Sequence, residues 1–306
     1  MTNKHLTIEN QEILLQMGGL ELGDTAVSSD TQLPLIPTFV YNDDGTGWDM
    51  QIGDIPNDWK NATSFGGGNP DNQKDNLIIG NSVASIGSYA FRGWNSNNHP
   101  LVIPDSVTSI GFAAFGGWNS NDQPLVIPDS VTSIGNYAFG FWTANNQPLV
   151  IPDSVTSIGN DAFRFWTANN QPLVIGDSVT SIGNYAFQGW DSNDQPLVIP
   201  DSVTSIGNYA FQGWDSNDQP LVIPDSVTSI ESNAFSDWTA MTEPIYFGCP
   251  FSALTGSDIL RNNTVTQIYA RASQGWPVNT TQNISGSPNT IEILEWENYP
   301  VAIPNN

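Results

Sequence analysis

Acidic side chains recur in this 306-residue sequence at spacings that suit a hard cation. Two loops repeat the pattern Asp-Ser-Asn-Asp and place carboxylates at Asp191, Asp194, Asp215 and Asp218. Calcium prefers oxygen ligands of this kind, although the spacing matches no EF-hand loop. Equivalent loops elsewhere read Thr-Ala-Asn-Asn, so a structural calcium site and plain turn formation remain alternative interpretations.

Residues suited to catalysis are scarce. Only two histidines occur, His5 and His99, so neither a histidine general base nor a Ser-His-Asp triad is expected. The single cysteine, Cys249, cannot form an internal disulfide, and we expect it to act as a small buried hydrophobic residue. Paired carboxylates that cleave glycosides need two different environments, whereas identical repeats supply identical ones. We predict a protein without enzymatic activity and without a cofactor, and keep a carbohydrate-active enzyme as the least favoured alternative.

Two columns of side chains could contact a ligand without cutting it. The first column is tyrosine, interrupted by Ala113 and Asp161, and its candidate contact residues are Tyr89, Tyr137, Tyr185 and Tyr209. The second column is threonine, and its candidates are Thr132, Thr156, Thr180 and Thr204. Aromatic rings can stack on sugars, and threonine hydroxyls can order water as ice-binding ladders do, but one threonine per repeat supports the latter weakly.

Charge limits the class of partner. The chain has 31 acidic residues against 7 lysines and arginines, a formal net charge of -24. Nucleic-acid binding needs a cationic patch, and no stretch of this sequence supplies one. The first residues lack the basic tip and apolar run of a secretory signal, and no run approaches the ~18 apolar residues of a membrane span. We therefore expect neither nucleic-acid binding nor membrane insertion.

The candidate residues above belong to a sequence repeat of 24 residues. One column in this register is Phe91, Phe115, Phe139, Phe163, Phe187, Phe211 and Phe235. Another is Trp94, Trp118, Trp142, Trp166, Trp190, Trp214 and Trp238. A fixed period in this range indicates a solenoid, in which each coil buries its apolar face against its neighbours. We expect both aromatic columns to lie in the core, with a row of exposed sugar-binding tryptophans as the alternative.

Within one repeat, residues 196–199 alternate like a short strand, with Leu197 and Ile199 inward and Val198 outward. A turn at 200–202 leads to a second extended segment at 203–206. The apolar residues that follow are spaced at i, i+4, i+5 and i+8, which predicts one short α or 3-10 helical turn per repeat.

These units, read as P-L-V-I-P-D-S-V-T-S-I-G-N-Y-A-F-x-G-W, resemble the BspA-like leucine-rich repeats of bacterial surface proteins. The resemblance covers Asn76 to about Tyr246, and two segments from Glu243 and Thr266 are similar to the closing segment of such arrays. This chain departs from the family in having tryptophan where cysteine is usual and a repeat about one residue longer. The resemblance implies a β-rich α/β solenoid, a right-handed leucine-rich-repeat coil with short parallel strands, and a binding role without shared catalytic residues.

Four regions follow from the register. We predict an N-terminal anchor or docking segment at 1–54, a degenerate capping coil at 55–78, seven repeats at 79–246, and a C-terminal cap at 247–306 with a strand added near 290–296.

The function expected from these features is non-enzymatic recognition on the exterior of a virion or cell. A phage surface, decoration or fibre component is favoured, and a bacterial adhesin exported without a standard signal peptide is the alternative. Residues 1–54 would dock to an assembly partner, the repeat surface would bind a glycan or protein receptor, and a homo-oligomer is compatible with the sequence.

Overall fold

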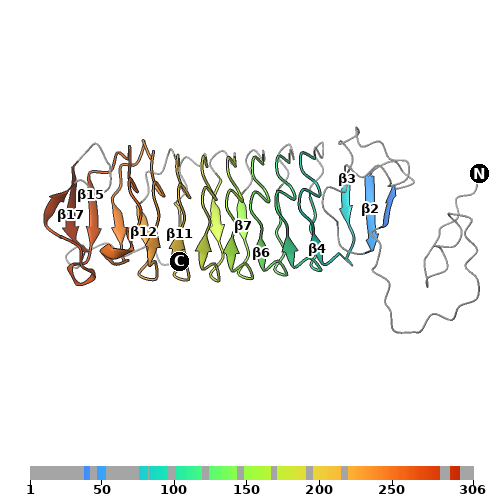
Figure 1. Ribbon diagram of the computed structural model, residues 1–306, viewed down its shortest axis with the longest axis horizontal. Coiled ribbons are helices and arrows are strands. Elements are labelled where there is room, and N and C mark those ends of the chain that lie inside the picture. Colours follow the sequence, from blue (N-terminus) through green and yellow to red (C-terminus); the bar gives the residue numbers. More distant parts are fainter. Residues whose placement is uncertain are drawn as a thin grey trace, which may run out of the picture. The chain divides into compact units, whose positions relative to one another are not determined.

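The computed structural model describes residues 38–41, 47–52, 76–81, 83–94, 101–118, 124–142, 148–166, 171–190, 196–214, 220–282 and 290–296. The chain divides into two units, Met1–Leu35 and Ile36–Asn306, and every described residue belongs to the second. Within that unit, successive coils stack side by side with like elements in line (Figure 1). The predicted solenoid is confirmed.

Each coil contributes short strands that pair only with their equivalents in the neighbouring coils. A seven-stranded parallel sheet contains β4 (Ser85–Ile86), β5 (Ser109–Ile110), β6 (Ser133–Ile134), β8 (Ser157–Ile158), β10 (Ser181–Ile182), β11 (Ser205–Ile206) and β13 (Ser229–Ile230). The Leu-Val-Ile segments form a second ladder in separate pieces: β7 (Leu149–Ile151) pairs with β9 (Leu173–Ile175), and β12 (Leu221–Ile223) begins a five-stranded sheet at the C-terminal end. Isolated bridges join Val102 to Val126 and Val198 to Val222 in the same ladder.

At the C-terminal end, the second ladder continues beyond the repeats. Strand β14 (Ile245–Phe247) pairs in parallel with β12, followed by β15 (Gln267–Ala270) and β17 (Ile291–Glu295). The antiparallel strand β16 (Thr280–Gln282) lies at the edge, and 3-10 helices η3 (Phe251–Ala253) and η4 (Ala272–Gln274) connect these strands. The strand expected near 290–296 is therefore present as β17.

At the N-terminal end, three strands form one sheet. Strand β3 (Asn76–Ile79) pairs in parallel with β2 (Gly47–Ile52), and β1 (Thr38–Tyr41) pairs antiparallel with β2. Strands β1 and β2 belong to residues 1–54, the segment predicted as an N-terminal anchor or docking segment. Residues 53–75, which include most of the predicted capping coil, lie outside the described residues. Among the described residues, no helix is both long and apolar enough to cross a bilayer.

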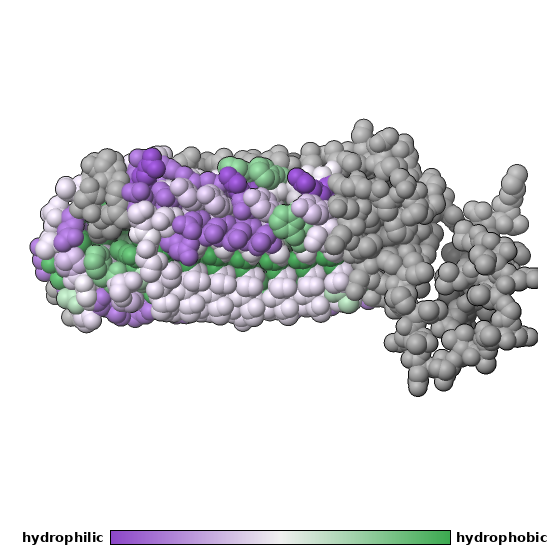
Figure 2. Space-filling model, viewed as in Figure 1, coloured by the Kyte–Doolittle hydropathy of each residue, from purple (hydrophilic) through white to green (hydrophobic). Residues whose placement is uncertain are grey.

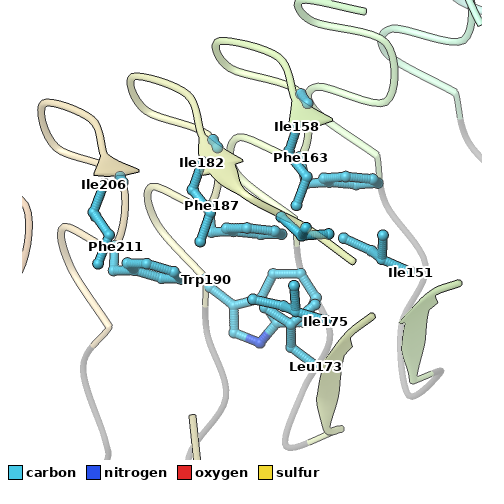
Figure 3. Close-up of a cluster of buried hydrophobic side chains, with 14 of the residues drawn as sticks. Ile151, Ile158, Phe163, Leu173, Ile175, Ile182, Phe187, Trp190, Ile206 and Phe211 are labelled. Atoms are coloured by element: carbon cyan, nitrogen blue, oxygen red, sulfur yellow. The ribbon is translucent and has the colours of Figure 1, made fainter. Parts of the chain in front are cut away.

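Like side chains from successive coils meet in the core. The phenylalanine column is fully buried, and neighbouring rings such as Phe163 and Phe187 stack with centroids 5.5 Å apart at 3°. The tryptophans lie beside them, with Trp166 and Trp190 stacked at 5.9 Å and 5°. Figure 3 shows this repetition over three coils. Because no tryptophan of the column is more than 5% exposed, its predicted place in the core is confirmed and an exposed tryptophan row is ruled out.

The helical turn predicted after each second strand is wrong. In its place, residues such as 184–189 form consecutive turns with left-handed backbone at Tyr185 (φ 58°) and Gly189 (φ 69°). Tyr185, Phe187 and Gly189 donate their backbone N–H groups to carbonyls of the next coil at 2.8 Å. A helix needs those N–H groups for its own i−4 carbonyls and cannot continue through left-handed residues, so stacking replaces it. We call this segment of each coil the turn strip.

Polar side chains also join one coil to the next. Ser202 Oγ donates to the carbonyl of Val179 at 2.7 Å, and Thr204 Oγ1 donates to that of Thr180 at 3.0 Å. The acceptor of the Ser202 hydroxyl lies 23 residues earlier in the chain, so this bond joins two coils and does not close a local turn. Close stacking also explains Gly183, where a Cβ would lie 2.6 Å from the backbone carbon of Gly159.

Candidate binding surfaces

One candidate surface is the outer side of the Leu-Val-Ile ladder. Leucine and isoleucine point inward and valine points outward, as predicted for Val198. The outward valines are 43–60% exposed and are Val102, Val126, Val150, Val174 and Val198. In-register pairs join Val102 to Val126 and Val150 to Val174, and because the coils themselves stack in register, the five valines form one apolar line along the repeats.

A column of carboxylates borders this apolar line. Each aspartate follows its valine by three residues and is exposed: Asp105, Asp129, Asp153, Asp177, Asp201 and Asp225. Asp153 Oδ1 accepts the backbone N–H of Asp177 at 2.8 Å. Of these six, only Asp225 forms an ion pair with another described residue. We call the valine line and the aspartate column together the strand face; it is apolar along its centre and anionic along one edge.

The chain itself covers the strand face at its C-terminal end. There Tyr246 and Tyr269 occupy the outward position, and both rings are buried. Trp296 packs on Tyr246 with centroids 5.4 Å apart. Arg271 lies 4.6 Å above the Trp296 ring and donates to Asp225 Oδ2 at 2.8 Å. An aromatic side chain on the apolar line and an arginine on the carboxylate column are thus the groups this face accommodates.

A second candidate surface is a shallow groove of about 300 Å³. Its lining residues are Asn136, Ile158, Gly159, Asn160, Ser181, Ile182, Gly183, Asn184, Ser205, Ile206, Gly207 and Glu231. We call it the asparagine groove. Figure 2 shows a narrow hydrophobic line beside a hydrophilic band along the repeats. The groove is open and crosses several coils, so it suits an extended ligand and not a small enclosed one.

The asparagines of the groove form a hydrogen-bonded ladder. The Oδ1 atoms of Asn136, Asn160 and Asn184 each accept the backbone N–H of the asparagine in the following coil at 2.8 Å. Asn208 Nδ2 ends the ladder by donating to Glu231 Oε2. These bonds fix the amide groups in one orientation, which lowers the entropic cost of binding a ligand.

The predicted tyrosine and threonine contact residues do not line this groove, although several of them are next to lining residues in the sequence. Each of the four tyrosines, Tyr89, Tyr137, Tyr185 and Tyr209, is the second residue of its turn strip and is half-buried. Tyr185 and Tyr209 stack at 4.9 Å and 6°, while Tyr89 and Tyr137 pack edge-on against Phe112. Thr132, Thr156, Thr180 and Thr204 are exposed, but each hydroxyl donates to the carbonyl of the preceding coil's equivalent residue. Because each threonine hydroxyl already donates its proton to a neighbouring coil, its oxygen can only accept a hydrogen bond from a ligand.

Sequence reasoning missed two exposed aromatic residues, Phe141 and Phe165. They lie 51% and 39% exposed, with ring centroids 5.3 Å apart. The signal was present in the sequence, because four other repeats have glycine in this column: Gly93, Gly117, Gly189 and Gly213. Its meaning becomes clear only with the backbone, which is left-handed at every one of these positions.

The remaining predicted sites are the single cysteine and the calcium candidates. Cys249 is buried as expected, and burial raises the pKa of its thiol to about 12, so the nucleophilic thiolate is absent near neutral pH. The calcium candidates Asp191, Asp194, Asp215 and Asp218 lie outside the described residues, and calcium at those loops stays a prediction. Within the part of the chain that the structure describes, no three histidine, cysteine, aspartate or glutamate side chains gather as a metal site would require.

The family model for the BspA type leucine rich repeat region matches residues 71–194 and 190–268 in six copies. No match was found among curated proteins. A leucine-rich repeat protein from Bacteroides ovatus of known crystal structure shares 18% identity, with a TM-score of 0.41 over 88% of this chain and 79% of that one. Because the family model covers more than half of the sequence, this chain belongs to the BspA-type leucine-rich repeat family.

Proposed function

We propose that this protein is a non-catalytic binding protein whose strand face holds a segment of a partner protein. The observation that carries the proposal is the exposed valine line bordered by exposed carboxylates over five coils. A continuous apolar line of this length is unusual on a surface that faces only water. Equivalent coils present equivalent contacts, so many weak contacts add up along one ligand.

The partner's chemistry follows from the covered end of the same face. Trp296 occupies the apolar line there, and Arg271 occupies the carboxylate column. The net charge of -24 makes a cationic partner favourable at long range and disfavours a second copy of this chain as the occupant. We therefore propose a partner segment that carries aromatic and arginine side chains.

We also propose that the protein is displayed on the outside of a cell or a virion, with residues 1–54 docking to the structure that carries it. Membership of a family of surface-type repeats supports external display, and the notably acidic, lysine-poor repeats are compatible with it. Detection of the chain in purified phage particles would support the virion, whereas its recovery with the cell envelope and absence from particles would support an adhesin.

The binding proposal is tested with a labelled synthetic peptide that alternates arginine and tryptophan, separated by serines, and with a matched peptide that has alanine for tryptophan. The test variant combines Asp129→Asn, Asp153→Asn, Asp177→Asn and Asp201→Asn, which keep side-chain oxygens while removing charge. Exposed ion pairs contribute about 0.2–1 kcal/mol each, so the variant is expected to bind roughly tenfold more weakly. Fluorescence anisotropy gives the Kd.

A second variant tests the apolar contact separately from the charge. This variant, Val150→Ser with Val174→Ser, removes apolar contact without changing charge and is also expected to weaken binding of the tryptophan peptide. Equal affinity of the original protein for the tryptophan and alanine peptides, or equal affinity of the original and charge-neutralised proteins, would contradict the proposal.

A further inference from the structure

The pair Phe141 and Phe165 is a departure from repeat equivalence on the turn strips. Both residues have left-handed backbone, with φ of 60° and 53°, at a position where glycine occurs in four other coils. A bulky residue at positive φ is disfavoured because its Cβ crowds the backbone. Burial does not compensate, since the two side chains are 51% and 39% exposed.

The surroundings hold these rings in place at the surface. The Arg164 guanidinium lies 4.8 Å from the Phe165 ring centroid and 5.0 Å from that of Tyr185. Arg164 also pairs with Asp161 at 3.0 Å, so its charge is balanced locally. The Phe165 ring covers Gly189, where an added Cβ would lie 2.4 Å from Phe165 Cδ1. The pair and its neighbours thus form a fixed aromatic platform, which we call the phenylalanine platform.

The phenylalanine platform and the asparagine groove belong to the same coils. Asn136 and Phe141 lie at opposite ends of one turn strip, and Asn160 and Phe165 do so in the next. A ligand that reaches both features meets flat apolar rings on one side and a row of fixed amides on the other.

We propose that the phenylalanine platform and the asparagine groove bind a neutral polysaccharide. A pyranose ring has an apolar C–H face, which fits an exposed aromatic ring, and hydroxyl edges, which fit amide and hydroxyl groups that both donate and accept. The groove is open at its surface and spans the coils from Asn136 to Glu231, as an extended polymer requires. The acidic chain, with Glu231 at the end of the amide ladder, disfavours an anionic polysaccharide.

This site is independent of the strand face. Its residues come from the turn strips and the second strands, whereas the strand face comes from the Leu-Val-Ile ladder. Failure of either proposal therefore leaves the other in place.

The test is affinity electrophoresis of the full chain in native gels that contain a β-glucan, an α-glucan, a mannan or, as the anionic comparison, hyaluronate. The test variant is Phe141→Gly with Phe165→Gly, which restores the residue found in other coils and relieves the left-handed strain. The matched control is Val150→Ser with Val174→Ser on the strand face. At least one neutral polysaccharide is expected to retard the original protein, with a Kd at least tenfold weaker for the double glycine variant and unchanged for the control.

Several outcomes would overturn the proposal. One is the absence of retardation by all three neutral polysaccharides, and another is equal retardation of the original protein and the double glycine variant. Retardation by hyaluronate alone would assign the site to polyanions. A dimer that dissociates in the double glycine variant, measured by light scattering, would show that the platform is covered by a second copy of the chain instead.

Discussion

Replacing Phe187 with alanine should remove a large part of the contact between three successive coils. The Phe187 side chain is fully buried, and its ring stacks on Phe163 at 5.5 Å and on Phe211 at 5.4 Å. A buried phenylalanine replaced by alanine costs about 3–5 kcal/mol, and aromatic pairs add about 0.5–1.5 kcal/mol each beyond area burial. Because both stacked pairs are lost, we expect Phe187→Ala to lie toward the upper end of that range.

The assay is urea unfolding of the full chain followed by tryptophan fluorescence. Stability in a stacked array is a sum of coil and nearest-neighbour terms, so the curves are fitted to a nearest-neighbour model. We expect the lost free energy to fall mainly on the two interfaces that Phe187 makes, with broader unfolding as the array loses cooperativity.

Phe165→Gly is the matched control, since Phe165 is an exposed phenylalanine one coil away. It loses a partly exposed ring but gains a residue suited to its left-handed backbone. We expect a change below about 1 kcal/mol in either direction. A loss below about 1 kcal/mol for Phe187→Ala, or equal losses for both variants, would refute a core built from like side chains stacked coil on coil.

Three further predictions concern single core positions. Trp238 Nε1 donates to the Phe211 carbonyl at 2.6 Å, whereas the buried Trp190 Nε1 finds no hydrogen-bond partner among the described residues. Trp238→Phe should therefore cost about 1 kcal/mol more than Trp190→Phe in the same unfolding assay. Gly183→Ala should cost about 1–3 kcal/mol because its Cβ meets backbone of the preceding coil, while Gly116→Ala, whose Cβ meets nothing nearer than 3.4 Å, should lower the Tm little. Burial raises the pKa of Cys249 from 9.0 to about 12 in the folded protein, so the native state keeps the thiol proton to higher pH than the unfolded chain does. The free energy of unfolding should therefore fall as pH rises from 9.0 to about 12, and Cys249→Ala should remove this part of its pH dependence.

The periodicity predicted the architecture because each column of the repeat carries one chemical character. Leu197 and Ile199 point inward and Val198 outward, and the phenylalanine and tryptophan columns are buried as expected. The strand β17 could also be predicted from local alternation. In each case the decisive information is which side chains are apolar and how they are spaced.

The turn strip could not be predicted in the same way. Spacings of four and eight residues suit a helix, but they also suit two turns whose N–H groups bond to the next coil. Whether a helix or two turns form depends on hydrogen bonds to a coil 24 residues away, and the local spacing of apolar residues does not report those bonds. The phenylalanine platform shows the same limit, since Phe141 and Phe165 become unusual only once their left-handed backbone is known.

The stacking of equivalent residues can be tested by pairwise cysteine replacement on the strand face. Val150 and Val174 are exposed Cα partners in adjacent parallel strands, and strand spacing of ~4.8 Å lies within the Cα range of a disulfide. Val150 and Val198 are two coils apart, about twice that spacing, which exceeds the range. Under mild oxidation and mass spectrometry, Val150→Cys with Val174→Cys is expected to form an intramolecular disulfide, and Val150→Cys with Val198→Cys is expected to remain reduced. No bridge in the adjacent pair, or equal bridging in both pairs, would contradict the stacked solenoid.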